Sequence, residues 1–302
     1  MAANTRDIRR RIKSIKNTAQ ITKAMQMVAA SKMRRAQAAA LAGRPYAAQL
    51  NKVLESLSSI VSGEDASHPL LRKRTEGKEL VLLVSTDKGL CGALNTNLLR
   101  EAAKFDPANT VFVAAGRKGM QYLVRNKRDV AAEFELKDNF TFLDSKAASK
   151  FCMERFLSGA FAKVTVLFTN FVNTLTQTPR SQTILPVSEL KASIEVPKSV
   201  AAAAEAQAPA ADLGAAATEY LFEPNALAVL DAILPHYVHF QVYQMILDSR
   251  ASEHSARMVA MKSATDNAKQ LIKDLTLEYN KVRQASITTE LLEISTAQMA
   301  LG

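Results

Sequence analysis

The last third of the chain has the hydrophobic periodicity of a long helix. Neither glycine nor proline occurs in the 66 residues from 236 to 301, which as one helix would span roughly 100 Å. Apolar residues recur there in steps of three and four, the spacing of a coiled coil, with a break at Glu278, where Tyr279 lies one position along. The residues of this stripe are Met261, Ala264, Ala268, Leu271, Leu275, Val282 and Ala285.

The first 42 residues also lack glycine and proline and predict a second long helix. Its apolar stripe begins with coiled-coil spacing, then shifts around the helix twice. The stripe runs through Ile8, Ile12, Ile15 and Ala19, then Ile21, Met25 and Val28, then Ala29, Met33 and Ala36. A stripe that shifts this quickly predicts contacts on more than one face. We expect the two terminal helices to pair antiparallel, with further partners around them.

The middle of the chain has a different pattern. Short apolar, β-branched runs at 79–86, 110–116 and 164–171 predict strands. Helical stretches at about 93–105, 117–127 and 145–161 lie between or beside them. This alternation is typical of a mostly parallel sheet covered by helices.

The predicted fold class is therefore α/β, with a long antiparallel coiled coil of the N- and C-terminal helices plus a central α/β domain. We expect an N-terminal long helix within 1–75, the α/β domain in 76–190 and the C-terminal long helix within 220–302. An Ala-rich loop or linker at 191–219 separates the last two, and 199–218 is its low-complexity part.

The positive charge of the chain is concentrated in one segment at its N-terminal end. Residues 1–35 hold ten lysines and arginines against Asp7, so they carry +9 of the net charge of +10. Such a segment needs an anionic partner, either phosphate, a lipid surface or an acidic protein.

Four interpretations of the basic segment compete. A targeting peptide would end at a cleavage-like boundary, whereas this segment continues as one unbroken helix. A surface membrane helix would carry Trp, Phe or Leu on its apolar face, and the segment has none of these. A nucleic-acid-binding arm explains the charge, but no aromatic residue precedes Tyr46. A solvated helix packed on its own domain leaves the apolar band around Met25 and Met27 unexplained. The residues favour protein–protein contact, with nucleic acid as the alternative.

Candidate chemistry is sparse. The sequence STDKGLCGALNTN at 85–97 follows a strand and opens a helix, where α/β folds often bind phosphate, but it lacks both common glycine-rich phosphate motifs. Cys91 has no histidine nearby in sequence, and we expect an unreactive thiol. His236 and His239 share a helix face without an acidic third ligand, which is a poor metal site. We expect no catalytic centre, cofactor or metal.

Three long segments together resemble the gamma subunit of F-type ATP synthases. They are IRRRIKSIKNTAQITKAMQMVAASKMRRAQ (8–37), STDKGLCGALN (85–95) and SEHSARMVAMKSATDNAKQLIKDLTLEYNKVRQASITTELLEI (252–294). The likeness, with YLFEP at 220–224, extends over nearly the whole chain outside 191–218. It implies a rotor without nucleotide or catalytic site, turning inside a collar of three alpha and three beta subunits. Its further partners are the epsilon subunit and the membrane-embedded c-ring, through which proton flow drives ATP synthesis at beta.

The resemblance also implies contact residues. Met25 matches the position facing an acidic lever loop of beta, and Arg257 matches a residue near it. Arg283 and Gln284 match a pair that hydrogen-bonds a catch loop of beta, and Lys88 and Cys91 match a loop near the lever. The family position occupied by Gln298 is usually alanine. The start at MAANTRDIRRRIK implies a bacterial protein at the cytoplasmic face of the inner membrane, in a hetero-oligomer, with neither nucleic acid nor membrane insertion.

Overall fold

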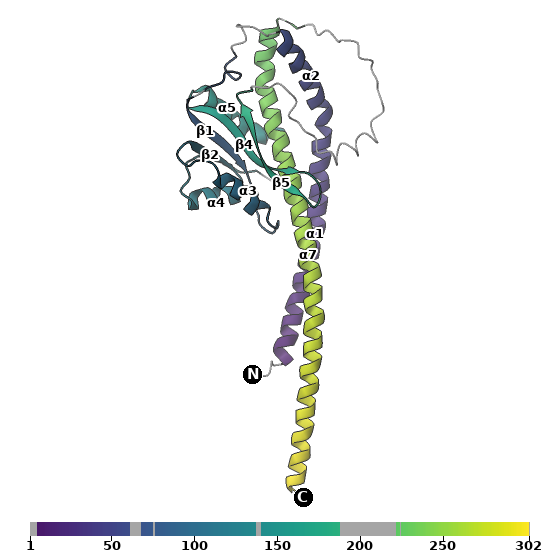
Figure 1. Ribbon diagram of the computed structural model, residues 1–302. Helices are drawn as coiled ribbons and strands as arrows, with labels where there is room; N and C mark the ends of the chain where they lie inside the picture. The colour runs from purple at the N-terminus through teal and green to yellow at the C-terminus, as the bar shows by residue number, and fades with distance from the viewer. Residues whose placement is uncertain are drawn as a thin grey trace. The chain divides into compact units, whose positions relative to one another are not determined.

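A computed structural model describes residues 5–60, 68–74, 76–136, 140–187, 222–223 and 225–301 (Figure 1). The chain forms two compact units. One contains the residues up to Ala30 and those from Arg257 onward, and the other contains Ser31–Ala256. The predicted linker at 191–219 lies outside the described residues.

The second unit is built on a five-stranded sheet. Its strands are β1 (Lys78–Val84), β2 (Thr110–Ala115), β3 (Val130–Phe134), β4 (Phe161–Phe171) and β5 (Gln177–Leu185). Their order is β3-β2-β1-β4-β5. The first four strands run parallel and β5 pairs antiparallel with β4, which confirms the mostly parallel sheet.

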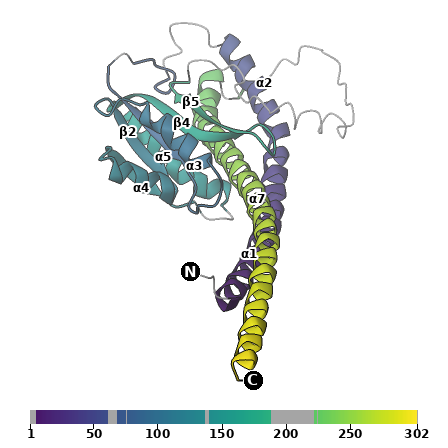
Figure 2. The same cartoon turned by 60° about the horizontal axis from the view of Figure 1, so that its bottom comes forward.

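Helices cover both faces of the sheet (Figure 2). On one face α3 (Leu94–Ala103) and α4 (Arg117–Arg125) pack on residues such as Phe112, which is fully buried. On the other face lie α2 (Arg44–Ile60), α5 (Phe142–Leu157) and the first part of α7 (Ala226–Leu301). Because both faces are covered, the central strands are mainly apolar.

The two edge strands were not predicted from the sequence. β3 alternates between half-buried and exposed side chains, and β5 reads QTPRSQTIL, with only Ile184 and Leu185 buried. Edge strands bury less surface than central ones, so they carry polar residues and a proline that obscure the pattern.

The C-terminal helix continues through a proline. α7 starts at Ala226, within the range 220–302 given from the sequence, and contains Pro235. A proline inside a helix removes one hydrogen bond and costs about 3 kcal/mol. Leu234, Tyr237 and Val238 next to it are at most 2% exposed, and this burial offsets the cost.

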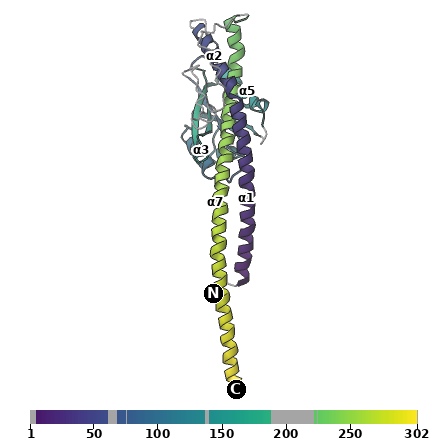
Figure 3. The ribbon, with the colours of Figure 1, turned by 90° about the vertical axis from the view of Figure 1, so that its right-hand side faces the viewer.

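The first unit is a two-helix coil, formed by α1 (Thr5–Ala42) up to Ala30 and by α7 from Arg257 onward (Figure 3). The residues that α1 buries in this coil differ from the apolar stripe predicted from the sequence. The buried and half-buried positions do not shift after Ala19. They continue in steps of three and four through Thr22, Gln26 and Ala29, with Met25 half-buried beside Gln26. Polar side chains at two of these positions hid the regularity from an analysis based on apolar residues.

The seam on α7 is regular for the same reason. Its residues are Met261, Thr265, Ala268, Ile272, Leu275, Tyr279 and Val282, and Ala264 of the predicted stripe is half-buried beside Thr265. The predicted break at Glu278 is therefore absent, and Leu271 and Ala285 of the predicted stripe are exposed. Tyr279 occupies an ordinary heptad position.

Two polar contacts fix the antiparallel register of this coil. The hydroxyl oxygens of Thr22 and Thr265 lie 2.7 Å apart, and Arg9 Nη2 donates to the Tyr279 hydroxyl at 3.0 Å. Thirteen residues of α1 thus run against fourteen of α7 between the two contacts. Past Val282, the described side chains of α7 are exposed up to Met299. Within the described residues, every helix is too short or too polar to cross a lipid bilayer.

Candidate functional site

The loop after β1 is held by its own hydrogen bonds. Thr86 Oγ1 donates to the Lys88 carbonyl at 2.8 Å, and Asn95 Nδ2 donates to Thr86 Oγ1 at 2.7 Å. Leu90 adopts a left-handed backbone at φ 62° and is 62% exposed. The loop therefore presents Leu90 and the exposed Lys88 outward from a rigid base.

The first N–H groups of α4 lie at the carboxyl edge of the sheet, where α/β folds bind phosphate. Here the chain itself satisfies three of them. Arg117 N donates to Asp87 Oδ1 at 3.1 Å, Lys118 N to the Thr86 carbonyl at 3.0 Å and Gly119 N to Ser85 Oγ at 2.8 Å. The Asp87 carboxylate thus occupies the position that a bound anion would take.

Gly116 permits this close approach. Its φ of 111° is a conformation that residues with a side chain rarely adopt, and a Cβ there would lie 2.3 Å from the Ser85 carbonyl oxygen. The glycine brings the start of α4 against the end of β1.

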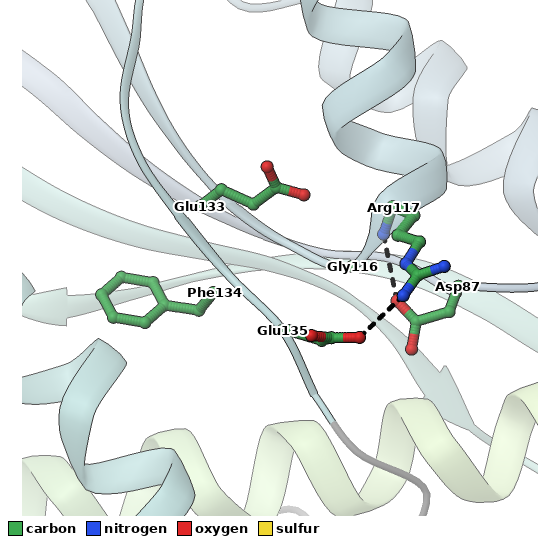
Figure 4. A pocket seen from close by; sticks show the side chains of 6 residues that line it. All are labelled: Asp87, Gly116, Arg117, Glu133, Phe134 and Glu135. Atoms are coloured by element: carbon green, nitrogen blue, oxygen red, sulfur yellow. Dashed lines mark hydrogen bonds and ion pairs between the residues drawn. The ribbon is translucent and has the colours of Figure 1, made fainter.

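A cavity of about 310 Å³ opens beside this turn (Figure 4). Carboxylates from Asp87, Glu133 and Glu135 line it, together with Arg117, whose Nη2 pairs with Glu135 at 2.8 Å. The Glu133 side chain extends toward the side on which Arg117 lies, and no interaction is drawn between the two (Figure 4). Three carboxylates against one guanidinium repel a phosphate group, so this cavity does not suit a nucleotide.

The thiols of both cysteines are buried, Cys91 at 2% exposure and Cys152 at 0%. Asn95 Nδ2 lies 3.4 Å from Cys91 Sγ. Burial raises the pKa of Cys152 to about 12, which keeps it a thiol at neutral pH.

The two candidate histidines pack within the α/β unit. His236 contacts the rings of Tyr46 and Phe142, and the Nδ1 atom of His239 lies 2.5 Å from Ser149 Oγ. Burial, assisted by nearby Lys146, lowers the pKa of His239 to about 4. Across the described residues, there is no group of three histidines, cysteines or carboxylates that could hold a metal ion.

The candidate contact residues fall into two groups. Met25 and Arg257 are half-buried in the two-helix unit, where Arg283 and Gln284 are exposed just past Tyr279. Lys88 and Cys91 belong to the α/β unit. The structure therefore gathers four of the six in one unit.

The structure adds an exposed apolar patch on α1 that the candidate residues did not include. It consists of Ile21, Met27 and Val28, which are 60%, 62% and 56% exposed. The shifted stripe of the sequence analysis was the signal for it, because the seam itself continues through Thr22 and Gln26.

Comparison with known proteins matches almost the whole chain to one family. The profile of a family described as ATP synthase matches residues 4–301. ATP synthase gamma chains are 50% identical in Methylacidiphilum infernorum and 46% identical in Opitutus terrae. The alignments cover 99% of this chain with 100% of the first relative and 99% of the second.

Solved structures show the same fold. The central stalk and c-ring structure of the Tetrahymena thermophila mitochondrial ATP synthase contains a chain that is 25% identical, with a TM-score of 0.57 over 81% of this chain and 99% of that one. A chain of the Euglena gracilis mitochondrial ATP synthase is 18% identical, with a TM-score of 0.65 over 98% of this chain and 94% of that one. From the sequence matches, the chain belongs to the ATP synthase gamma-chain family.

Proposed function

We propose that this gamma chain is the rotor in the central stalk of an F-type ATP synthase. It turns inside a collar of alpha and beta subunits and couples proton flow through the c-ring to ATP synthesis at beta. The solved relatives come from structures described as central stalk with c-ring, and as OSCP, F1 and c-ring. The epsilon subunit completes its partners, and the complex lies at the cytoplasmic face of a bacterial inner membrane.

One observation carries this proposal. The coiled-coil seam is complete, yet α1 still exposes Ile21, Met27 and Val28, and α7 exposes Leu291, Leu292 and Ile294. The two helices already pack their seam residues against each other, so the apolar side chains that stay exposed indicate a surrounding protein surface. The basic residues of α1 favour an acidic surface around that helix.

The chain needs no catalytic site of its own for this role. The start of α4 is occupied by Asp87, and the neighbouring cavity is lined by carboxylates. Both features support catalysis on a partner chain rather than here.

The contact residues are assigned accordingly. Met25 faces an acidic lever of beta, and an uncharged thioether lets that lever slide while nearby basic residues keep it close. Arg257, Lys88 and the loop around Cys91 lie near the same lever. Since the Cys91 side chain is buried, we assign that loop's contact to Lys88 and Leu90. Arg283 and Gln284 hydrogen-bond a catch loop of beta.

The test replaces Met25 by lysine in the reconstituted complex. A new ion pair with the acidic lever should retain ATP hydrolysis but reduce the protons pumped per ATP several-fold. Gln20→Lys, at an exposed site on the same helix, is the matched control for added charge.

Unchanged pumping in Met25→Lys would refute the contact. If the purified native chain instead retains nucleic acid in a salt-sensitive way and lacks alpha and beta chains, the rotor itself is refuted in favour of the basic arm.

A further inference from the structure

The contact of α7 with the sheet changes character along the helix. From Leu230 to Ile246 the buried residues facing the sheet are mainly apolar. The buried residues that follow are mostly polar, and this polar segment comprises Ser249, Arg250, Ser252, Glu253, His254 and Ser255. It lies at the carboxyl edge of the sheet, where related folds hold ligands.

Arg250 is the centre of the polar segment and is 5% exposed. Its Nη1 donates to Glu253 Oε2 at 2.9 Å, and its Nη2 lies 3.5 Å from Asp87 Oδ2 and donates to the Leu136 carbonyl. One side chain of α7 therefore reaches the chain just after β1 and the chain just after β3.

Two serines extend the contact to the other half of the sheet. Ser252 Oγ donates to the Thr169 carbonyl in β4 at 3.1 Å, and Ser255 Oγ donates to the Thr174 carbonyl at 2.8 Å, in the turn before β5. Asp87 also accepts the hydrogen bond from Arg117 N, so the carboxylate joins α4 to Arg250.

The two parts of the contact resist different movements. Apolar packing is non-directional, so it resists separation but resists rotation or sliding only weakly. Charge-assisted hydrogen bonds depend on geometry, and breaking a buried pair leaves an uncompensated charge. Stability alone does not explain the polar segment, because apolar replacements of buried ion pairs often stabilise proteins equally well. Within the described residues, Arg250 Nε lacks a hydrogen-bond partner, which also lowers its value for stability.

We propose that Arg250 is a positioning residue for rotation: it locks α7 against turning on the sheet, so that torque on the α/β domain passes into the helix. This inference rests on the rotor function proposed above. The polar segment fills the ligand-binding edge of the fold and converts it into a rigid joint.

The test uses the reconstituted complex with Arg250→Met combined with Glu253→Gln, which removes the buried pair without leaving Glu253 charged. Spin labels at Val124→Cys in α4 and Ala256→Cys in α7 report the distribution of distances between domain and helix. The second readout is the largest pH gradient that ATP hydrolysis sustains across the membrane. Arg125→Met, which removes an exposed arginine of α4, is the matched control.

The joint predicts a distance distribution about twofold broader and a lower maximal gradient in the double variant, because only apolar packing and the Ser252 and Ser255 hydrogen bonds then hold the helix. Its unfolding temperature and its ATP hydrolysis without a gradient should match the parent complex. A purely stabilising role would change the unfolding temperature instead. A parental distribution and gradient would overturn the proposal.

If the double variant does not assemble, Arg250→Lys decides the same question, because lysine keeps the charge but cannot reach Glu253, Asp87 and Leu136 together. It should broaden the distribution, and a parental width would overturn the joint. The unmodified chain tests the rotor separately, since its failure to restore proton pumping would refute the proposed function and not the joint.

Discussion

The α/β unit and the two-helix unit bury their side chains very differently. Every side chain of β2 is buried, and so are the last five of β1. In the two-helix unit, the buried residues among those described are only Ile8, Ala29, Met261, Thr265 and Ala268. The α/β unit has a core with two covered sheet faces, whereas the two-helix unit has one narrow seam.

This difference separates stability from contact. A covered sheet holds enough buried apolar surface to stabilise its own fold. A coil with one narrow seam, partly of threonine, glutamine and alanine, gains less, and it leaves most of its surface available to partners. Substitutions at buried sheet positions should therefore affect unfolding, while substitutions on the coil should affect coupling.

The largest effect is expected from Leu82→Ala in β1, where the side chain is fully buried. Loss of the leucine leaves a cavity and should lower the free energy of unfolding by about 3 kcal/mol. Leu291→Ala on the 61% exposed end of α7 is the control and should change it by less than about 0.5 kcal/mol. Urea unfolding of the full chain measures both, and equal losses would contradict the contrast between the units.

A smaller effect is expected from acid, and only in the α/β unit. The pKa of His239 is lowered to about 4, mainly by burial, with Lys146, His236 and Lys150 adding positive charge. Above pH 6.5 the imidazole is neutral in both states. Between pH 6.5 and 4 only the unfolded chain takes up the proton, so the free energy of unfolding should fall by about 2 kcal/mol.

Unfolding measured from pH 7.5 to 4.5 checks this expectation. His239→Gln removes the titrating group and should flatten that part of the profile, although it also loses the contact with Ser149. An equally steep profile in the variant would assign the acid effect to other groups.

The smallest effect concerns the register of the coil. Thr265→Val keeps the shape of the side chain but removes the hydroxyl beside Thr22, which should cost about 1 kcal/mol. Thr288→Val, beyond the paired part of α7, should cost almost nothing. Amide hydrogen exchange in the coil distinguishes them, and equal exchange in both variants would show that the hydroxyl pair does not fix the register.

The parts predicted from sequence were those with strong apolar patterns. β1, β2 and β4 are buried on both faces, so their composition reveals them, and Gly43 marks the end of α1. The half-buried β3 and the polar β5 were missed because an edge strand needs few apolar residues. The seam of the coil was misread at Thr22 and Thr265, where polar side chains satisfy each other.

The joint at Arg250 could not be predicted from local sequence. Asp87, Leu136 and Arg250 are far apart in the chain, and only the folded sheet brings them together. The available signal was the polar run SRASEHS within a helix that is otherwise apolar towards the sheet. The role of such a polar run can be assigned only when the edge of the sheet that it contacts is known.

The exposed end of α7 has a consequence for how the cell must make this protein. Leu291, Leu292, Ile294 and Met299 are each more than 60% exposed on a helix that α1 no longer accompanies. A chain synthesised in excess of its partners exposes this apolar segment to other proteins and to further copies of itself. Balanced production of the subunits therefore protects this chain from aggregation as well as supplying the complex with parts.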